Sequence, residues 1–423
     1  MSAIRNYVLV TLAYWAFTLT DGALRMLVLL HFHALGYTPV ELAFLFLFYE
    51  FFGVVTNLVG GWVAALLGLK VTLTGGLALQ VFALVMLAYA QPTWSVAMSV
   101  AYVMASQALS GIAKDLTKMS AKTSVKVLVP KEHGDRDRGD RALFKWVALL
   151  TGSKNALKGV GFFLGGALLT TLGYRGALFG MAGAIAIVFV GTVASLPGEM
   201  GRVKSKAKFK GLLSKSREIN VLSAARFLLF AGRDVWFVVG VPVFLSSALG
   251  WGFTKVGSFL ALWVIGYGAI QSLAPALIRR WTHGEVPRGT TARWLALLLA
   301  IVSALVALGV HFVRAPMLVV VGGLALFGVV FAINSSVHSF LILAYSAGDK
   351  VALNVGFYYM ANAGGRLVGS LLSGVLFQLG GVAACLWGAV AFGLATWGVS
   401  MALPSGQPEQ PLPVLWDDAA GGD

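Results

Sequence analysis

Hydrophobic segments follow one another along nearly the whole chain, and only short polar stretches separate them. A helix needs roughly 20 apolar residues to cross about 30 Å of hydrocarbon. Twelve segments have about this length or more, and the pattern therefore predicts an all-α membrane protein with twelve transmembrane helices. The segments are Asn6–His31, Glu41–Leu67, Val71–Ala90, Trp94–Asp115, Phe144–Thr170, Gly176–Leu196, Ile219–Ser246, Thr254–Leu277, Trp294–His311, Pro316–Tyr345, Val351–Gln378 and Val382–Leu403.

Composition supports a chain that lies in a bilayer. Of its 423 residues, 58% are hydrophobic and 12% are charged, and the mean hydropathy is +0.83. Soluble domains carry about twice this share of charge, so a soluble enzyme and a disordered protein are both excluded. The only cysteine, Cys385, excludes a disulfide within the chain and a multi-thiolate metal site. We expect no metal and no cofactor.

The basic residues predict the orientation. The formal net charge is +15, from 32 basic and 17 acidic residues. With a cytoplasmic N-terminus, twenty-one basic residues fall in stretches on the inner side and three (Arg175, Lys255 and Arg314) on the outer side. Positive charge accumulates on the cytoplasmic side of membrane proteins. Both termini are therefore expected to be cytoplasmic, and the basic loops are expected to rest on anionic lipid and not on nucleic acid.

The chain is expected to consist of two six-helix bundles, at 1–196 and 219–403. A basic cytoplasmic linker at 197–218 joins them, and a cytoplasmic tail at 404–423 is expected to be disordered. A weak internal repeat supports two pseudo-symmetric halves, because two dipeptides recur at an offset of 207. Asn155-Ala156 matches Asn362-Ala363, and Leu172-Gly173 matches Leu379-Gly380.

Ionisable residues at membrane depth are costly and usually face a cavity or a partner. Seven cations lie at depth against four acids, and arginine cannot readily lose its proton. Asp21 and Arg25 lie one turn apart and can pair, but even complete pairing leaves about three positive charges. A water-filled cavity that receives a small anion explains this surplus. The cations are Arg25, Lys114, Lys154, Lys158, Arg226, Arg233 and Arg366, and the acids are Asp21, Glu50, Asp115 and Asp234.

These residues divide into two candidate sets. Coupling or gating is assigned to Asp21, Glu50, Lys114, Asp115 and Asp234. Lys118 is expected to belong to a solvated basic helix face. The candidates for substrate binding are Arg25, Lys154, Asn155, Lys158, Arg226, Arg233, Asn334, His338, Tyr358, Asn362 and Arg366.

The stretch from Gly61 to Lys70 resembles the loop signature G-x-x-x-D-R-x-G-R-R of major facilitator transporters. Gly61, Gly68 and Lys70 fit, whereas Ala65 and Leu66 replace the acidic and basic residues. The resemblance implies two bundles that alternate access to a site at the membrane midplane. Without that acidic and basic residue, the charge interaction of this loop is not expected here.

Four further stretches resemble the ArsJ-type organoarsenical efflux permeases of the same superfamily: Phe17–His33, Phe48–Gly53, Gly111–Met119 and Gly152–Gly159. The resemblance implies a bacterial inner-membrane protein that exports 1-arseno-3-phosphoglycerate and so gives arsenate resistance. It also implies a functional partner, a glyceraldehyde-3-phosphate dehydrogenase that makes this ester from arsenate. Such a cargo is a small polyanion, which suits a cationic cavity.

Other functions stay open at this point. An organophosphate or other organic-anion exchanger, or a drug-type antiporter, would have the same fold. A receptor or scaffold could use the fold without transport. An enzyme is not expected, and the chain has no G-x-x-x-x-G-K-[ST] loop for ATP. Proton antiport is therefore the expected energy source, with Asp21, Glu50 or Asp234 as the titrating group.

Overall fold

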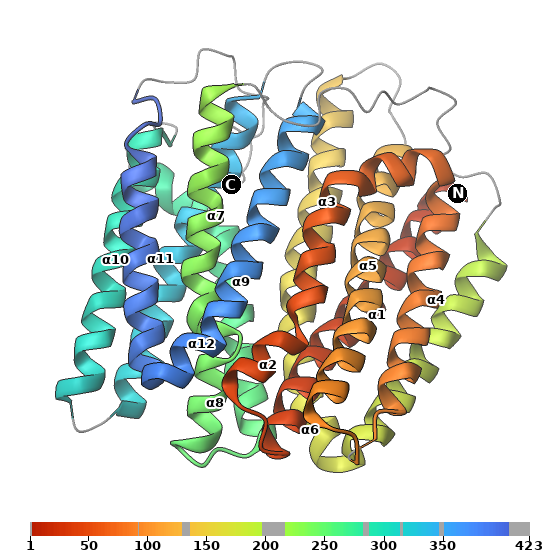
Figure 1. Ribbon diagram of the computed structural model, residues 1–423. Coiled ribbons are helices and arrows are strands. Elements are labelled where there is room, and N and C mark those ends of the chain that lie inside the picture. Colours follow the sequence, from red (N-terminus) through yellow and green to blue (C-terminus); the bar gives the residue numbers. More distant parts are fainter. Residues whose placement is uncertain are drawn as a thin grey trace. The chain divides into compact units, whose positions relative to one another are not determined.

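The computed structural model describes residues 2–91, 93–128, 136–196, 216–281, 287–313, 316–346 and 351–405. These residues form helices joined by short connections, without strands in the described ranges (Figure 1). The helices are α1 (Ser2–Ala34), α2 (Pro39–Leu45), α3 (Leu47–Leu67), α4 (Leu69–Ala88), α5 (Val96–Leu128), α6 (Arg136–Ser195), α7 (Arg217–Phe237), α8 (Gly240–Ser247), α9 (Phe253–Trp281), α10 (Gly289–Phe312), α11 (Pro316–Ala344) and α12 (Val351–Ser400).

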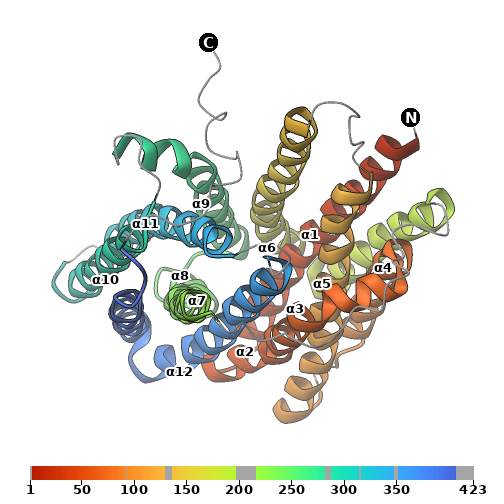
Figure 2. The same ribbon diagram turned by 90° about the horizontal axis from the view of Figure 1, so that it is seen from above.

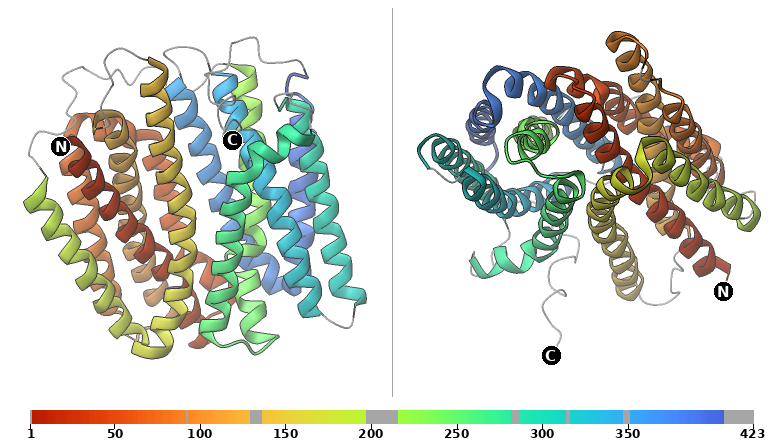
Figure 3. Two further views of the ribbon diagram at one scale, coloured as in Figure 1. Left: turned by 180° about the vertical axis from the view of Figure 1, so that it is seen from behind. Right: turned by 90° about the horizontal axis from the view of Figure 1, so that it is seen from below.

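All twelve predicted segments coincide with helical structure. The two longest helices, α6 and α12, each contain two of these segments and change direction between them (Figures 1 and 3). The backbone leaves helical geometry at Gly173 (φ +68°) in α6 and at Gly380 and Gly381 (φ +63° at Gly381) in α12. Glycine tolerates a positive φ because it has no Cβ. Among the described residues, ten stretches are long and apolar enough to cross a membrane. Those in α6 and α12 have 43 and 47 residues, which is room for two spans each.

Two predicted segments are divided into a short and a long helix. The segment at 41–67 separates into α2 and α3 at Phe46, and that at 219–246 separates into α7 and α8. At the second break, the backbone N–H groups of Val239 and Gly240 both donate to the Ser373 hydroxyl at 3.1 Å. A polar side chain from α12 thus satisfies backbone groups that the interrupted helix leaves open.

The chain forms two compact units. Unit 1 includes α1, α4, α5, α6, nearly all of α3 and the first part of α9, and unit 2 includes α2, α7, α8, α10, α11, α12 and the rest of α9. In full, unit 1 is Met1–Leu35, Phe48–Lys210 and Gly252–Ile265, and unit 2 is Gly36–Leu47, Gly211–Trp251 and Gly266–Asp423.

Unit 1 contains a close contact between α1 and α6. A Cβ at Gly22 would lie 2.7 Å from the backbone oxygen of Lys158 and 3.2 Å from the Cα of Gly161. The first of these contacts is shorter than a side chain tolerates, and the second is tight, so glycine allows the two helices to approach this closely. Apolar side chains of α1 and α4, such as Phe17 and Leu73, belong to a buried core in the same unit.

Unit 2 contains the corresponding contact between α7 and α12, which lie side by side in Figures 1 and 2. A Cβ at Gly369 would lie 2.7 Å from the backbone oxygen of Ala231. Aromatic rings of α7 and α11 fill the neighbouring core: Trp236 and Phe327 meet edge to face, with ring centroids 5.1 Å apart. Glycine contacts of the same kind thus hold one helix pair in each unit.

Some predictions fall outside the described residues. These include most of the linker at 197–218, the tail from residue 406 and the side chains at 60–66, which contain most of the loop signature. From that signature, Gly68 has a φ of +82° and precedes α4, and Lys70 donates a hydrogen bond to the backbone oxygen of Leu196. Lys70 therefore caps the end of the second part of α6.

Candidate functional site

Unit 1 contains a buried polar cluster, which we define as Asp21 and Arg25 of α1, Tyr49, Glu50, Thr56 and Asn57 of α3, and Lys114, Asp115 and Lys118 of α5. Arg25 donates to Glu50 at 3.0 Å, and both side chains are buried. The Tyr49 hydroxyl donates to Asp21 at 2.6 Å. The ion pair described for Arg25 thus joins two helices, whereas the sequence suggested Asp21, one turn away on the same helix.

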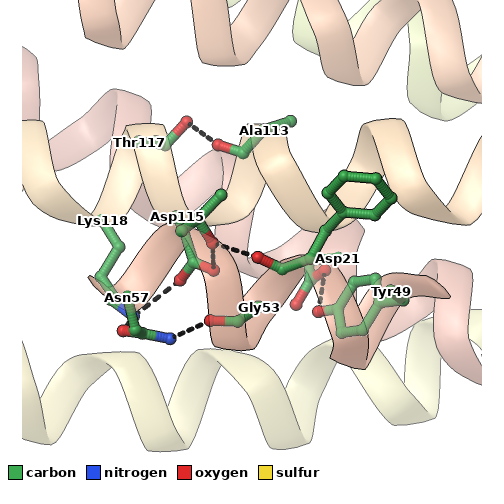
Figure 4. A network of polar contacts seen from close by, with 10 residues as sticks. Asp21, Tyr49, Gly53, Asn57, Ala113, Asp115, Thr117 and Lys118 are labelled. Carbon is green, nitrogen blue, oxygen red and sulfur yellow. Dashed lines mark hydrogen bonds and ion pairs between the residues drawn. The ribbon is translucent and has the colours of Figure 1, made fainter. Parts of the chain in front are cut away.

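The second part of the unit 1 cluster joins α3 to α5 (Figure 4). Lys118 donates to Asp115 at 2.7 Å and to the Asn57 side-chain oxygen at 2.8 Å. Thr56 donates to the other oxygen of Asp115. The expectation of a solvated Lys118 is wrong, because its side chain is only 15% exposed and neutralises a buried carboxylate.

The predicted lysines of unit 1 lie on α5 and α6. The Lys114 ammonium lies 3.9 Å from the centroid of the Tyr49 ring, within the range of a cation–π contact. Lys154, Asn155 and Lys158 are half-buried on α6, and the Lys158 ammonium lies 5.8 Å from the centroid of Phe162. Two of the three lysines thus lie over the face of an aromatic ring.

Unit 2 contains a second buried polar cluster, defined as Arg226, Arg233 and Asp234 of α7, Asn334, Ser335 and His338 of α11, and Tyr358, Asn362 and Arg366 of α12. Arg226 is 5% exposed. It donates to the Asn362 side-chain oxygen at 2.9 Å, and to the hydroxyl and backbone oxygen of Ser335 at 3.0 and 3.1 Å. Each of these partners is neutral, so they orient the guanidinium without cancelling its charge.

Aromatic rings enclose the same guanidinium. Its central carbon lies 4.1 Å from the centroid of Phe230 and 5.0 Å from that of Tyr358. Ser335 also lies within hydrogen-bonding distance of Tyr267 and Gln271 of α9. The sequence predicts that the polar stretch from Asn334 to His338, which includes Ser335, hydrogen-bonds the cargo. It does not predict that Ser335 meets Arg226, because that contact joins two helices.

Arg233 and Arg366 share one carboxylate. Arg233 donates through Nε to Asp234 Oδ1 at 2.6 Å, and Arg366 donates through Nε to Oδ2 at 3.3 Å. Together with Arg226, the unit 2 cluster therefore holds three arginines against one acid. Among these four described side chains, the positive charges outnumber the negative one.

Asn334 and His338 are fully buried, one turn apart on α11. Within the described residues, neither the two polar atoms of Asn334 nor the two ring nitrogens of His338 have a hydrogen-bond partner. Buried polar atoms are normally hydrogen-bonded. These two residues can therefore bind a further polar group next to Ser335.

The described residues do not contain a group of three or more His, Cys, Asp or Glu that could hold a metal ion. The long apolar helices indicate a multi-pass membrane protein. Ionisable residues buried at membrane depth are typical of the transporter class.

The family model of the Major Facilitator Superfamily matches residues 8–337, and the chain belongs to this family. The crystal structure of a bacterial homologue of the iron transporter ferroportin, in an inward-facing state, is similar in fold. Its TM-score is 0.68 at 16% sequence identity, and the match covers 94% of this chain and 98% of the other. The comparison with curated proteins gives no match. Family and fold together indicate transport of a small solute across a membrane.

Proposed function

We propose that this protein exports a small polyanionic organoarsenical, 1-arseno-3-phosphoglycerate, across the bacterial inner membrane and so gives arsenate resistance. The observation that carries the proposal is the charge of the unit 2 cluster: three arginines against one carboxylate. A buried charge without a counter-charge is costly. An anionic cargo lowers this cost, whereas a cationic cargo raises it.

The geometry of the unit 2 cluster suits phosphate and arsenate oxygens. Guanidinium groups donate in a planar fork that matches such oxyanions. Asn362 and Ser335 hold the fork of Arg226 in place, so little conformational entropy is lost when an anion binds. Asn334 and His338 can hydrogen-bond the uncharged part of the cargo, and Tyr358 packs against the guanidinium.

The identity of the anion rests on the resemblance of four stretches to the ArsJ-type permeases. It implies the dehydrogenase partner as well, since that enzyme would supply the ester at the cytoplasmic face. The lone thiol is compatible with this cargo, because Cys385 is buried and one thiol cannot form the thiolate cluster that trivalent arsenic prefers. For Lys154, Lys158 and Arg25 of unit 1, binding of an anionic group stays a prediction of the sequence.

The alternative is an exchanger of organophosphates or other organic anions, which the same arginines would serve. The similar crystal structure is that of a homologue of an iron transporter, but the excess of arginine in the unit 2 cluster favours an anion over a metal cation. A receptor or scaffold role would require that the cluster charges be dispensable.

Everted membrane vesicles test the proposal, because their outer face is the cytoplasmic one. With glyceraldehyde 3-phosphate, arsenate, NAD and the dehydrogenase outside, we expect arsenic to accumulate inside. Omission of the dehydrogenase should abolish accumulation. Uptake of arsenate alone would overturn the ester as cargo. If phosphate replaces arsenate in the mixture and the phosphorylated product is taken up equally well, the organophosphate exchanger is favoured.

Two substitutions on α7 make a matched pair for this assay. Arg226→Met removes the buried guanidinium, and accumulation should be lost. Arg217→Met removes an exposed arginine at the start of the same helix, and accumulation should be retained. Equal accumulation in both variants would overturn the anion site.

A further inference from the structure

Five polar side chains lie within two turns of α11, and they differ in whether the protein supplies their hydrogen-bond partners. Ser335 accepts from an arginine of α7 at 3.0 Å. Ser336 donates to a backbone oxygen of α9 at 3.1 Å, and Ser339 donates to a backbone oxygen of its own helix at 2.8 Å. The other two, Asn334 and His338, have no hydrogen-bond partner within the described residues. The three serines thus have partners in the protein, and the two larger side chains do not.

Asn334 and His338 are both 0% exposed. Burial of a polar atom without a hydrogen-bond partner costs free energy. All four polar atoms of these two side chains are in that position within the described residues. The two residues lie one turn apart and therefore on the same face of α11. Such a pair weakens the packing of a helix, and a ligand that supplies the missing partners recovers the cost.

The pair adjoins the guanidinium of Arg226. Ser335, whose hydroxyl accepts from Nη1 of Arg226, precedes His338 by three residues and follows Asn334 directly. Nε of Arg226 donates to Asn362 and Nη1 donates to Ser335, whereas Nη2 has no acceptor within the described residues. The N–H groups of Nη2 and the four polar atoms of the pair are thus available to a ligand in the same region of unit 2.

The guanidinium and the pair require different chemical groups of a ligand. A guanidinium can only donate, and it therefore binds anionic oxygens. An asparagine side chain has both a donor and an acceptor, and so has a neutral imidazole. A fully ionised oxyanion cannot satisfy the two acceptors, because it has no proton to donate. A hydroxyl group can, because it donates one hydrogen bond and accepts others.

We propose that Asn334 and His338 form a subsite that binds a hydroxyl group of the cargo, next to the anionic group that Arg226 binds. The cargo is then a hydroxylated organic anion, and the pair determines specificity against anions of equal charge that lack the hydroxyl group. This subsite rests on the proposed anion site, but it does not require arsenic in the cargo. A ligand without the hydroxyl group leaves buried polar atoms unpaired, which is how binding sites reject such analogues.

Two phosphate esters with the same three-carbon chain test the subsite. Glycerol 3-phosphate carries two hydroxyl groups on this chain, and propyl phosphate carries none. Isothermal titration calorimetry of the purified full-length protein in detergent measures the affinity of each ester. We expect the wild type to bind glycerol 3-phosphate roughly 10- to 100-fold more tightly. Equal affinities would show that water alone occupies the place of the hydroxyl group, and they would overturn the proposal.

Asn334→Leu and His338→Phe test the assignment to these two residues. Each variant should bind the two esters with similar affinity, close to that of the wild type for propyl phosphate. Thr396→Val is the control, because this buried threonine of α12 donates to a backbone oxygen of its own helix and lies outside the unit 2 cluster. It should keep the wild-type preference. A full preference in both Asn334→Leu and His338→Phe would overturn the assignment.

The same measurements distinguish the hydroxyl subsite from the proposed function. Arg226→Met should weaken the binding of both esters, because both contain the anionic group. If neither ester binds to the wild type, the anion site and the hydroxyl subsite are both wrong. If glycerol 3-phosphate is preferred but everted vesicles accumulate no arsenic, the arsenical cargo is wrong and the hydroxyl subsite is supported.

Discussion

Units 1 and 2 both contain a close glycine contact between two helices, but they differ in their buried charges. In both units a glycine helix pair brings two backbones together, α1 with α6 and α7 with α12. In unit 1 the described cations Arg25 and Lys118 each meet a carboxylate. In unit 2 Arg226 is held by neutral groups, and two further arginines share one acid. Packing can therefore be common to both halves while the polar chemistry of each half differs.

The largest expected effect comes from breaking the Asp115–Lys118 pair of unit 1. Asp115→Ala leaves the Lys118 ammonium buried without its carboxylate, and we expect a loss of about 3–5 kcal/mol of stability. Thermal unfolding in detergent measures it. The double variant Asp115→Leu with Lys118→Met should recover most of the loss, because an apolar pair needs no counter-charge. A single variant as stable as wild type would show that this pair, with its hydrogen bonds to Thr56 and Asn57, does not hold α3 to α5.

Arg226→Met in unit 2 should affect transport more than stability. The neutral groups around Arg226 lose hydrogen bonds but no counter-charge. We expect arsenic accumulation to fall on the order of 100-fold, which corresponds to about 2.7 kcal/mol of lost anion binding. Stability should fall by less than in Asp115→Ala. If Arg226→Met lowered stability more than Asp115→Ala does, the distinction between a structural cluster in unit 1 and a binding cluster in unit 2 would be wrong.

The glycine contacts should respond equally in the two units. Gly22→Ala and Gly369→Ala each place a methyl group 2.7 Å from a backbone oxygen of the neighbouring helix. We expect each substitution to cost about 1–3 kcal/mol of stability in detergent. Gly180→Ala is the control, because open space surrounds its Cβ position. Unequal losses of stability at Gly22 and Gly369 would show that the two glycine contacts are not equivalent.

The smallest expected effect is that of Ser335→Ala. Arg226 loses its bond to the hydroxyl but keeps the bond to the backbone oxygen of the same residue. We expect about 1 kcal/mol, or roughly fivefold weaker transport at low cargo concentration. A much larger loss would mean that the hydroxyl contacts the cargo itself.

The helices were largely predictable from the sequence, because a long apolar run in a bilayer has few alternatives to a helix. Even the repeated Leu-Gly dipeptide carried structural information. Leu172-Gly173 and Leu379-Gly380 both lie where α6 and α12 change direction. The repeated Asn-Ala dipeptide marks a polar position in each half, and at Asn362 that position holds the guanidinium of Arg226.

The partners within the clusters were not predictable. Arg25 was expected beside Asp21, because sequence spacing shows only neighbours on one helix. Its described partner Glu50 comes from another helix, as does Asn57 for Lys118. Helix rotation and crossing set these pairings, and they depend on which small residues lie at each contact.

The sequence by itself determined that this is an all-helical membrane protein with a small surplus of buried positive charge, because apolar length and charge count follow directly from composition. Only the tertiary structure decided how that charge is distributed. It paired the acids Glu50, Asp115 and Asp234 with cations, left Asp21 with a phenol, and gave Arg226 neutral partners. The physical reason is that a salt bridge acts over a few ångströms, and side chains far apart in sequence reach that distance only when helices pack.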